Sequence, residues 1–245
     1  MEQVRVVVAH DERTTLRVGD VFLKVDGDDE RLDAEVEALA AAPVPTPRVL
    51  WRRPHVLALA AVRGTPLGRV GEPSTASPAA WRAAGAVVRT LHDAPLPTRM
   101  APGIDARARR LERESAWLVE HDVLPAGLVA HNRALAETAL RPAPPVFAHG
   151  DLQADHVFVV DDAVAGIIDW SEAARDDAAF DLALLTLGHA ERLDDVLDGY
   201  GSEVDQDRIR AWWSWRCLVG VRWLVEHGFD PFAPGCEVDV LRAQP

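Results

Sequence analysis

The chain has 245 residues, of which 48% are hydrophobic and 27% charged, and its formal net charge is −13. This is the balance of an ordinary soluble protein, long enough for one large domain or for two lobes with cores of their own. The acidity argues against nucleic acid as a partner, because a phosphate backbone is bound by basic surface. It favours cationic ligands, or it simply maintains solubility.

The cysteine content and the N-terminus indicate the cellular compartment. Cys217 and Cys236 are too few and too widely spaced for a disulfide framework or a CxxC metal site, so we expect reduced thiols. The first residues, MEQVRVVVAH, lack the features of a signal peptide. No apolar run approaches the roughly 20 residues that cross a bilayer. We therefore expect a cytoplasmic protein with no membrane partner.

The N-terminal quarter is predicted to be a β-sheet with one helix. Gly19 and Asp20 form a hairpin turn signal between two apolar segments. A helix is expected to begin at Asp28 or Asp29, either of which can cap it, and to end before the prolines that start at Pro43. The apolar segments expected to be strands are 4–8, 16–18, 21–25, 48–51 and 56–62.

The rest of the chain is predicted to be mostly helical. The sequence RGTP at 63–66 breaks the strand pattern, and we place a lobe boundary there, between residues 1–63 and 64–245. Ser77 and Pro78 form a helix start, with serine as the cap and proline in the first turn. The tail from Pro231 is expected to be irregular. The predicted helices are 77–92, 104–120, 125–139, 177–189, 193–200 and 206–227.

A second hairpin is predicted within the helical part. The apolar runs 157–160 and 165–168 flank Asp161 and Asp162, a pair that favours a tight turn. This hairpin brings Asp151, His156 and Asp169 to one of its ends. Carboxylates placed in this way suit a hard cation such as Mg²⁺, which usually also takes phosphate oxygens as ligands.

The residues around this hairpin carry a family resemblance. HGDL at 149–152, IDW at 168–170 and the segment 178–183 resemble motifs of the aminoglycoside phosphotransferase and choline kinase-like family, which shares the protein-kinase fold. With Lys24 and Glu35 upstream, the resemblance covers most of the chain. It implies an α+β fold of two lobes: a small antiparallel β-sheet with one helix, then a larger, mostly helical lobe.

The resemblance also implies roles for single residues. Asp151 would accept the proton of an acceptor hydroxyl or orient that hydroxyl. Asp169 would bind Mg²⁺ between the phosphates of ATP or GTP, and Lys24 would contact the α- and β-phosphates. Glu35 would hold the Lys24 ammonium in place, and Glu37 on the same helix is the alternative for that role.

The chain departs from the family pattern in two places. His156 stands where the family usually has a metal-binding asparagine, and although Mg²⁺ prefers oxygen, a neutral imidazole can bind a metal. Macrolide phosphotransferases resemble the chain at this position. No glycine-rich nucleotide loop is visible, so the turn at 11–15 is expected to cover the phosphates through the hydroxyls of Thr14 and Thr15 and through backbone N–H groups.

Further polar and aromatic residues are expected to be structural. His149 would orient the loop that carries Asp151, and Asp181 would accept hydrogen bonds from that loop. His92 is expected to pack at the end of its helix. The tryptophans of 206–227 are expected to lie in the core rather than in a ligand cage.

These features together predict a small-molecule kinase. It would phosphorylate a hydroxyl of an aminoglycoside or similar cationic antibiotic and so confer resistance, with ATP or GTP as the donor and Mg²⁺ as the cofactor. A macrolide or other metabolite kinase is the alternative. A degenerate kinase that binds a nucleotide or a partner without transfer is motivated by His156 and the missing glycine loop. The presence of Asp151, Asp169 and Lys24 together argues against a degenerate kinase.

Overall fold

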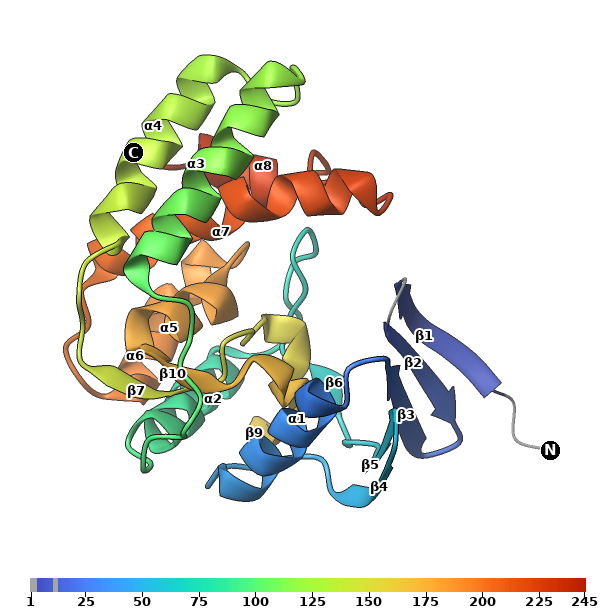
Figure 1. Cartoon of the computed structure of the whole chain (residues 1–245). Coiled ribbons are helices and arrows are strands. Elements are labelled where there is room, and N and C mark those ends of the chain that lie inside the picture. Colours follow the sequence, from blue (N-terminus) through green and yellow to red (C-terminus); the bar gives the residue numbers. More distant parts are fainter. Residues whose placement is uncertain (1–3, 11–12) are drawn as a thin grey trace.

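The computed structural model describes residues 4–10 and 13–245, and within them the N-terminal part is an antiparallel sheet in the order β1-β2-β3-β5-β4 (Figure 1). Gly19, with a φ of 57°, makes the tight turn between β2 and β3. The predicted sheet is therefore confirmed. Its strands are β1 (Val4–His10), β2 (Arg13–Val18), β3 (Val21–Asp26), β4 (Val49–Arg53) and β5 (Val56–Ala60).

Helix α1 (Asp29–Ala41) connects β3 to β4. Its cap is Asp28, whose side chain accepts hydrogen bonds from the backbone N–H groups of Glu30 and Arg31. The helix buries Glu35 among its apolar residues and packs on the short turn η2 (Trp170–Glu172). This contact carries a helix of the N-terminal part onto the segment that includes Asp169.

The remaining helices match the predicted ones, with one addition. The tail expected to be irregular contains α8, because Val238 and Leu241 are fully buried three residues apart on one face of a single short helix. A pattern of two apolar residues is too short to stand out in the sequence. The helices are α2 (Pro78–His92), α3 (Ile104–Glu120), α4 (Ala126–Ala139), α5 (Ala178–Thr186), α6 (Leu193–Tyr200), α7 (Gln206–Glu226) and α8 (Glu237–Arg242).

The predicted second hairpin is present as β8 (Val157–Val160) and β9 (Ala163–Ile167). Asp161 and Asp162 both have positive φ, 47° and 62°, as the two central residues of a type I′ turn require. β6 (Thr65–Pro66) pairs with β8 on its other side.

A further strand pair was not predicted. β7 (Pro145–Ala148) pairs antiparallel with β10 (Ala174–Asp177), which has the sequence ARDD. Because three of its four residues are charged, β10 lacks the apolar alternation by which a strand is recognised. The pair joins the segment before His149 to the segment that follows Asp169.

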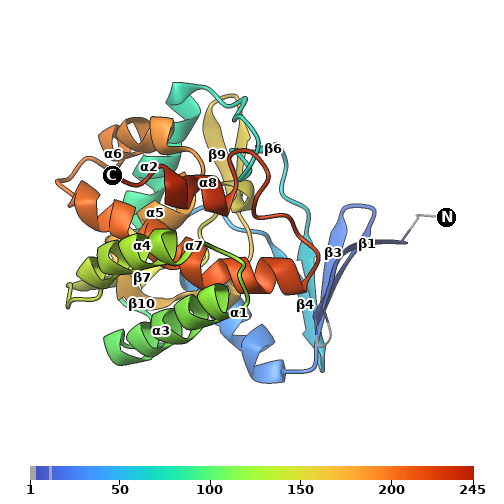
Figure 2. The same ribbon diagram turned by 90° about the horizontal axis from the view of Figure 1, so that it is seen from above.

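The helices cover one another in the larger part of the chain. In Figure 2, α7 runs beside α3 and α4, and its C-terminal end points toward the sheet. Trp212, Trp213 and Trp215 of α7 are buried in the core as predicted, whereas Trp223 is 42% exposed. None of the helices in the described ranges has the length and apolar character needed to cross a membrane.

Candidate active site

The loop that carries Asp151 runs between β7 and β8, and one buried carboxylate holds its backbone. Asp181, in the first turn of α5, accepts hydrogen bonds from the backbone N–H groups of His149 at 2.7 Å and Gly150 at 2.9 Å. Gly150 has a φ of 82°, and a Cβ there would lie 2.3 Å from the carbonyl oxygen of Glu172. Only glycine fits this turn without displacing the backbone.

The ring of His149 fixes the loop from inside the core. It is fully buried, donates from Nε2 to the carbonyl oxygen of Ile168 at 3.0 Å, and accepts at Nδ1 from the N–H of Asp151 at 3.3 Å. Burial lowers the pKa of His149, which agrees with the neutral ring that these two bonds require. The ring therefore orients the loop, as predicted, and connects it to the strand end that precedes Asp169.

The side chain of His92 contacts the carboxylate of Asp181, and Tyr200 in turn contacts His92. His92 Nε2 lies 3.1 Å from Asp181 Oδ2, and His92 Nδ1 lies 2.9 Å from the hydroxyl of Tyr200. Burial acts to raise the pKa of Asp181, but the hydrogen bond from His92 and the charges around it outweigh that effect and lower the pKa. The sequence placed His92 at a helix end but contained no signal for this chain of contacts.

Asp151 is a partly exposed carboxylate in this loop. Its side chain is 27% exposed, and Gln153 Nε2 lies 3.0 and 3.2 Å from its two oxygens. Arg216 of α7 approaches Asp151 Oδ1 to 4.0 Å. A carboxylate oriented by an amide donor and open to solvent on one side can accept a proton from a bound hydroxyl.

Lys24 joins the sheet to α1 and to the loop after β9. Its Nζ lies 2.5 Å from Glu35 Oε1 and 2.9 Å from Asp169 Oδ1. Lys24 is 7% exposed and Glu35 is 1% exposed, so this ion pair is largely screened from water. Glu37 is exposed, and the structure brings Glu35 rather than Glu37 to the lysine.

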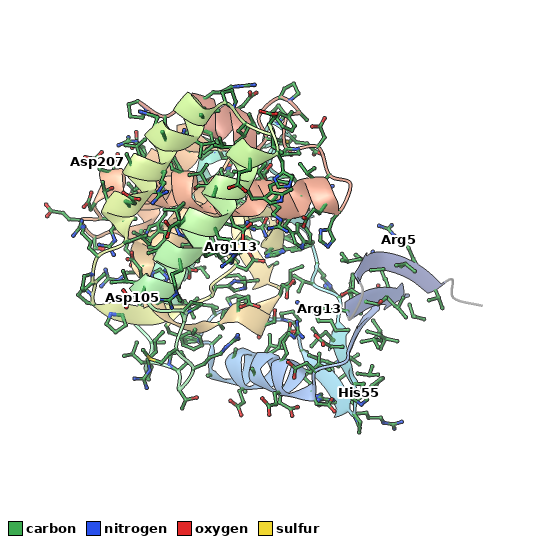
Figure 3. All side chains as sticks on the ribbon, turned by 45° about the horizontal axis from the view of Figure 1, so that its top comes forward. Arg5, Arg13, His55, Asp105, Arg113 and Asp207 are labelled. Atoms are coloured by element: carbon green, nitrogen blue, oxygen red, sulfur yellow. The ribbon has the colours of Figure 1, made fainter. Side chains whose placement is uncertain are left out.

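Asp169 also contacts a second cation, which no pattern in the sequence indicated. Arg13 of β2 donates to Asp169 Oδ1 at 3.1 Å and to Ser171 Oγ at 3.2 Å. Figure 3 shows Arg13 where the sheet meets the rest of the chain. Burial acts to raise the pKa of Asp169, but Lys24, His156 and Arg13 outweigh it and hold that pKa well below its usual range. Asp169 is therefore a stable carboxylate anion.

The strand register decides which residues of β2 share the face of Lys24. Thr15 is paired with Lys24, whereas Thr14 is paired with Val25. Residues directly opposite each other in an antiparallel pair project to the same face. Thr15 therefore lies on the face of Lys24 and Arg13, and Thr14 lies on the other face. The first two residues of the predicted phosphate-covering turn at 11–15 lie outside the described part of the chain.

The residues around Asp169 fit a metal ion that arrives with a nucleotide. The described ranges hold no group of three or more His, Cys, Asp and Glu side chains arranged as a metal site. Mg²⁺ nevertheless needs only one or two carboxylates when phosphate oxygens and water complete its shell. His156 donates from Nδ1 to the carbonyl oxygen of Asp151 at 2.8 Å, so in the neutral form of the ring Nε2 carries the lone pair. Asp169, and His156 through Nε2, would hold the ion.

We expect Glu35→Gln to lower kcat/KM for the nucleotide by about 10- to 100-fold, because releasing Lys24 misplaces a positioning group. Glu37→Gln is the matched control, with the same charge change on the exposed side of the same helix, and we expect it to retain wild-type kinetics. Steady-state kinetics at varied nucleotide concentration measures both. Equal losses in the two variants would contradict the pairing of Lys24 with Glu35.

We expect His156→Asn to keep or raise Mg²⁺-dependent activity, because an amide oxygen is a harder ligand than imidazole. The Mg²⁺ concentration for half-maximal rate should fall by about tenfold, an effect typical of altered metal surroundings. A Mg²⁺ titration of the rate checks this. An unchanged Mg²⁺ dependence would exclude His156 as a ligand.

Known phosphotransferases resemble the chain over most of its length. A family profile described as "Phosphotransferase enzyme family" matches residues 7–215. The aminoglycoside phosphotransferase APH(3'')-Id from Streptomyces rimosus is 25% identical and has a TM-score of 0.65, with 88% of this chain and 92% of that chain covered. A search of curated proteins by sequence finds no match.

Two further solved structures share the fold at lower identity. Macrolide 2'-phosphotransferase MphH from Brachybacterium faecium is 18% identical with a TM-score of 0.64, and 99% of this chain and 93% of that chain are covered. Spectinomycin phosphotransferase APH(9)-Ia, solved with ADP and spectinomycin, is 14% identical with a TM-score of 0.73, at coverages of 98% and 92%. These neighbours confirm the expected α+β, kinase-like fold. Since the family profile spans most of the chain, the protein belongs to the phosphotransferase enzyme family.

Proposed function

We propose that the protein transfers the γ-phosphoryl group of ATP or GTP to a hydroxyl of a small-molecule acceptor in the cytoplasm. The observation that carries the proposal is the convergence on Asp169 of Lys24 from the sheet, with Glu35 of α1 behind it. In this proposal these residues help to neutralise the charge of the nucleotide phosphates. Positioning and charge neutralisation are the main contributions of a protein to phosphoryl transfer. The proposed lobe division at residues 63 and 64 places Lys24 and Glu35 in one lobe and Asp169 in the other.

In the proposed reaction, the acceptor hydroxyl oxygen forms a bond to the γ-phosphorus. The bond between that phosphorus and the β,γ-bridging oxygen breaks, and the nucleoside diphosphate leaves. The hydroxyl proton passes to the carboxylate of Asp151, which Gln153 orients. Lys24 contacts the α- and β-phosphates, and Thr15, rather than Thr14, lies on the same face of the sheet as Lys24. Bound Mg²⁺ would supply neutralisation of the phosphate charge, held by Asp169 and His156.

Two antibiotic classes are candidate acceptors. The first is an aminoglycoside or a similar cationic antibiotic, supported by the family, by the 25% identity to an aminoglycoside phosphotransferase and by the net charge of −13. Phosphorylation of such a compound would confer resistance. The second is a macrolide, favoured by His156 and by a macrolide phosphotransferase among the structural neighbours.

A nucleotide-consumption screen tests the proposal. Wild-type protein with Mg²⁺ and ATP or GTP is incubated with aminoglycosides, macrolides, peptide antibiotics and small amino alcohols, and product is identified by mass spectrometry. We expect an acceptor-dependent mass gain of one phosphoryl group. Tight nucleotide binding without transfer to any hydroxylated acceptor would instead indicate a degenerate kinase and overturn the proposal.

A further inference from the structure

An arginine lies beside the proposed base and has little compensation for its charge. Arg216, in the middle of α7, places Nη2 4.0 Å from Asp151 Oδ1, and its side chain is 30% exposed. Within residues 4–10 and 13–245, no carboxylate oxygen lies closer to its guanidinium. By contrast, Arg107 and Arg208 of the helical part are in hydrogen-bonded contact with Asp176 and Asp177, respectively. The guanidinium of Arg216 is therefore available to a ligand.

A glycine in the same helix makes room for this guanidinium. A Cβ at Gly220 would lie 2.7 Å from Arg216 Nη1, so an added methyl group would shift the end of this arginine side chain. Glycine inside a helix is unfavourable relative to alanine. Gly220, one turn beyond Arg216, thus lets the arginine side chain lie along the helix next to the loop that carries Asp151.

A second arginine adds positive charge on the neighbouring helix. Arg110 of α3 lies with its guanidinium carbon 5.7 Å from the ring centre of Trp215, and no ion pair of Arg110 occurs within the described ranges. Burial lowers the pKa of Arg110, and the nearby charge of Arg216 lowers it further. Arg110 of α3 and Arg216 of α7 therefore interact electrostatically, with Glu114 also acting on Arg110, and with Asp151 and Glu237 near Arg216.

Arg216 reaches the site from a different direction than the groups assigned to the nucleotide. Lys24 and Arg13 approach Asp169 from the sheet, whereas Arg216 approaches Asp151 from α7. With the phosphates on the sheet side, the α7 side is left for the acceptor. Arg216 supplies a positive charge beside Asp151 on that side, although the net charge of the chain is −13.

We infer that Arg216, supported by Arg110, binds an anionic group of the acceptor, a carboxylate or a phosphate ester close to the hydroxyl that is phosphorylated. This inference rests on the proposed phosphoryl transfer and points to an anionic acceptor in place of the cationic antibiotics named above. A guanidinium binds carboxylate and phosphate through two parallel hydrogen bonds, and this geometry suits it to hold such a group in one orientation. The net acidity of the chain acts over longer distances and is screened beyond about 8–10 Å, so contact charge decides recognition.

The test uses the full chain saturated with Mg²⁺ and β,γ-imido-ATP, which fills the γ-phosphate position. Malonate and methyl phosphate are titrated at constant ionic strength, with calorimetry as the readout, and their two affinities show which anion the site prefers. We expect saturable binding to wild type and at least tenfold weaker binding to Arg216→Gln. Gly220→Ala should also weaken binding, because its methyl group displaces the guanidinium while the charge stays.

Arg210→Gln is the matched control. It removes the same charge from the same helix, at an arginine that interacts with Asp207 and Gln206, and should leave anion binding unchanged. Equal anion affinity in wild type and Arg216→Gln, or no saturable binding to wild type, would overturn the inference. So would a loss confined to β,γ-imido-ATP affinity in Arg216→Gln, which would assign the arginine to the nucleotide. If wild type did not bind β,γ-imido-ATP, that result would count against the proposed function alone. The anion titration could still be run in the absence of the nucleotide analogue.

The kinetic arm compares acceptors that differ only in the anionic group, such as glycerate with glycerol and ribose 5-phosphate with ribose. We expect Arg216→Gln to raise KM at least tenfold for the anionic acceptor of each pair and to leave the KM of the neutral acceptor unchanged. For a cationic antibiotic the opposite is expected: Arg216→Gln should lower its KM, because the substitution removes a nearby positive charge. Efficient turnover of an aminoglycoside that improves in Arg216→Gln would refute the inference while leaving the proposed function intact.

Discussion

Asp151→Asn is expected to reduce phosphoryl transfer by about 10²- to 10⁴-fold, the range that a positioned general base contributes. The amide keeps the size of the side chain but cannot take up the proton of the acceptor hydroxyl. Asp151 lies apart from the contacts between Lys24, Glu35 and Asp169, so binding of the Mg²⁺–nucleotide complex should persist. Single-turnover kinetics measures the chemical step, and calorimetry with β,γ-imido-ATP measures binding.

Asp155→Asn is the matched control for this change. It lies in the same loop with a side chain that is 44% exposed, and it removes the same charge. We expect its turnover to stay close to that of wild type. Unchanged turnover in Asp151→Asn across the accepted substrates would refute the assignment of the base.

Asp181→Ala is expected to lower the free energy of unfolding by about 3–5 kcal/mol, the cost of removing one partner from a buried charged contact. The change leaves the N–H groups of His149 and Gly150, and the ring of His92, without their acceptor in the core. Such a loss is a large share of the stability of a typical domain. Urea denaturation followed by tryptophan fluorescence measures it.

Asp194→Asn, at an exposed position of α6, provides the comparison and should change stability little. Asp181→Asn should fall between it and Asp181→Ala, because the amide oxygen can still accept a hydrogen bond. Equal midpoints for Asp181→Ala and Asp194→Asn would show that the loop does not depend on Asp181.

The same carboxylate predicts a pH dependence. The folded environment lowers the pKa of Asp181, so its contribution to stability is complete above the unfolded value of about 3.9. That contribution is lost as the pH falls through the lower pKa of the folded state. Wild type should therefore lose more stability than Asp181→Asn below about pH 4. Parallel acid titrations of the two proteins would contradict this expectation.

The sequence identified the short-range features of the site. The tight turn at Asp161 and Asp162 and the motifs that contain Asp151 and Asp169 depend on neighbouring residues, and local preferences therefore reveal them. The strand pattern around Lys24 and the helix that carries Glu35 are equally local. Strand β10 was not predicted because its charged residues find their partners only after folding. Asp176 of β10, for example, pairs with Arg107 of α3.

Only the tertiary structure decided which distant side chains meet. It placed Lys24 on Glu35 rather than Glu37, brought Arg13 to Asp169 across 156 residues, and set Thr15 rather than Thr14 on the lysine face.

The same holds for the groups around the loop. The contact of His92 with Asp181, and the approach of Arg216 to Asp151, join helices whose patterns are independent in the sequence. Amino-acid order determines the periodicity of each element, but register and helix packing are settled by burial of all the elements together. The residue types needed for phosphoryl transfer could therefore be read from the sequence, whereas the charge that an acceptor meets depends on the folded chain.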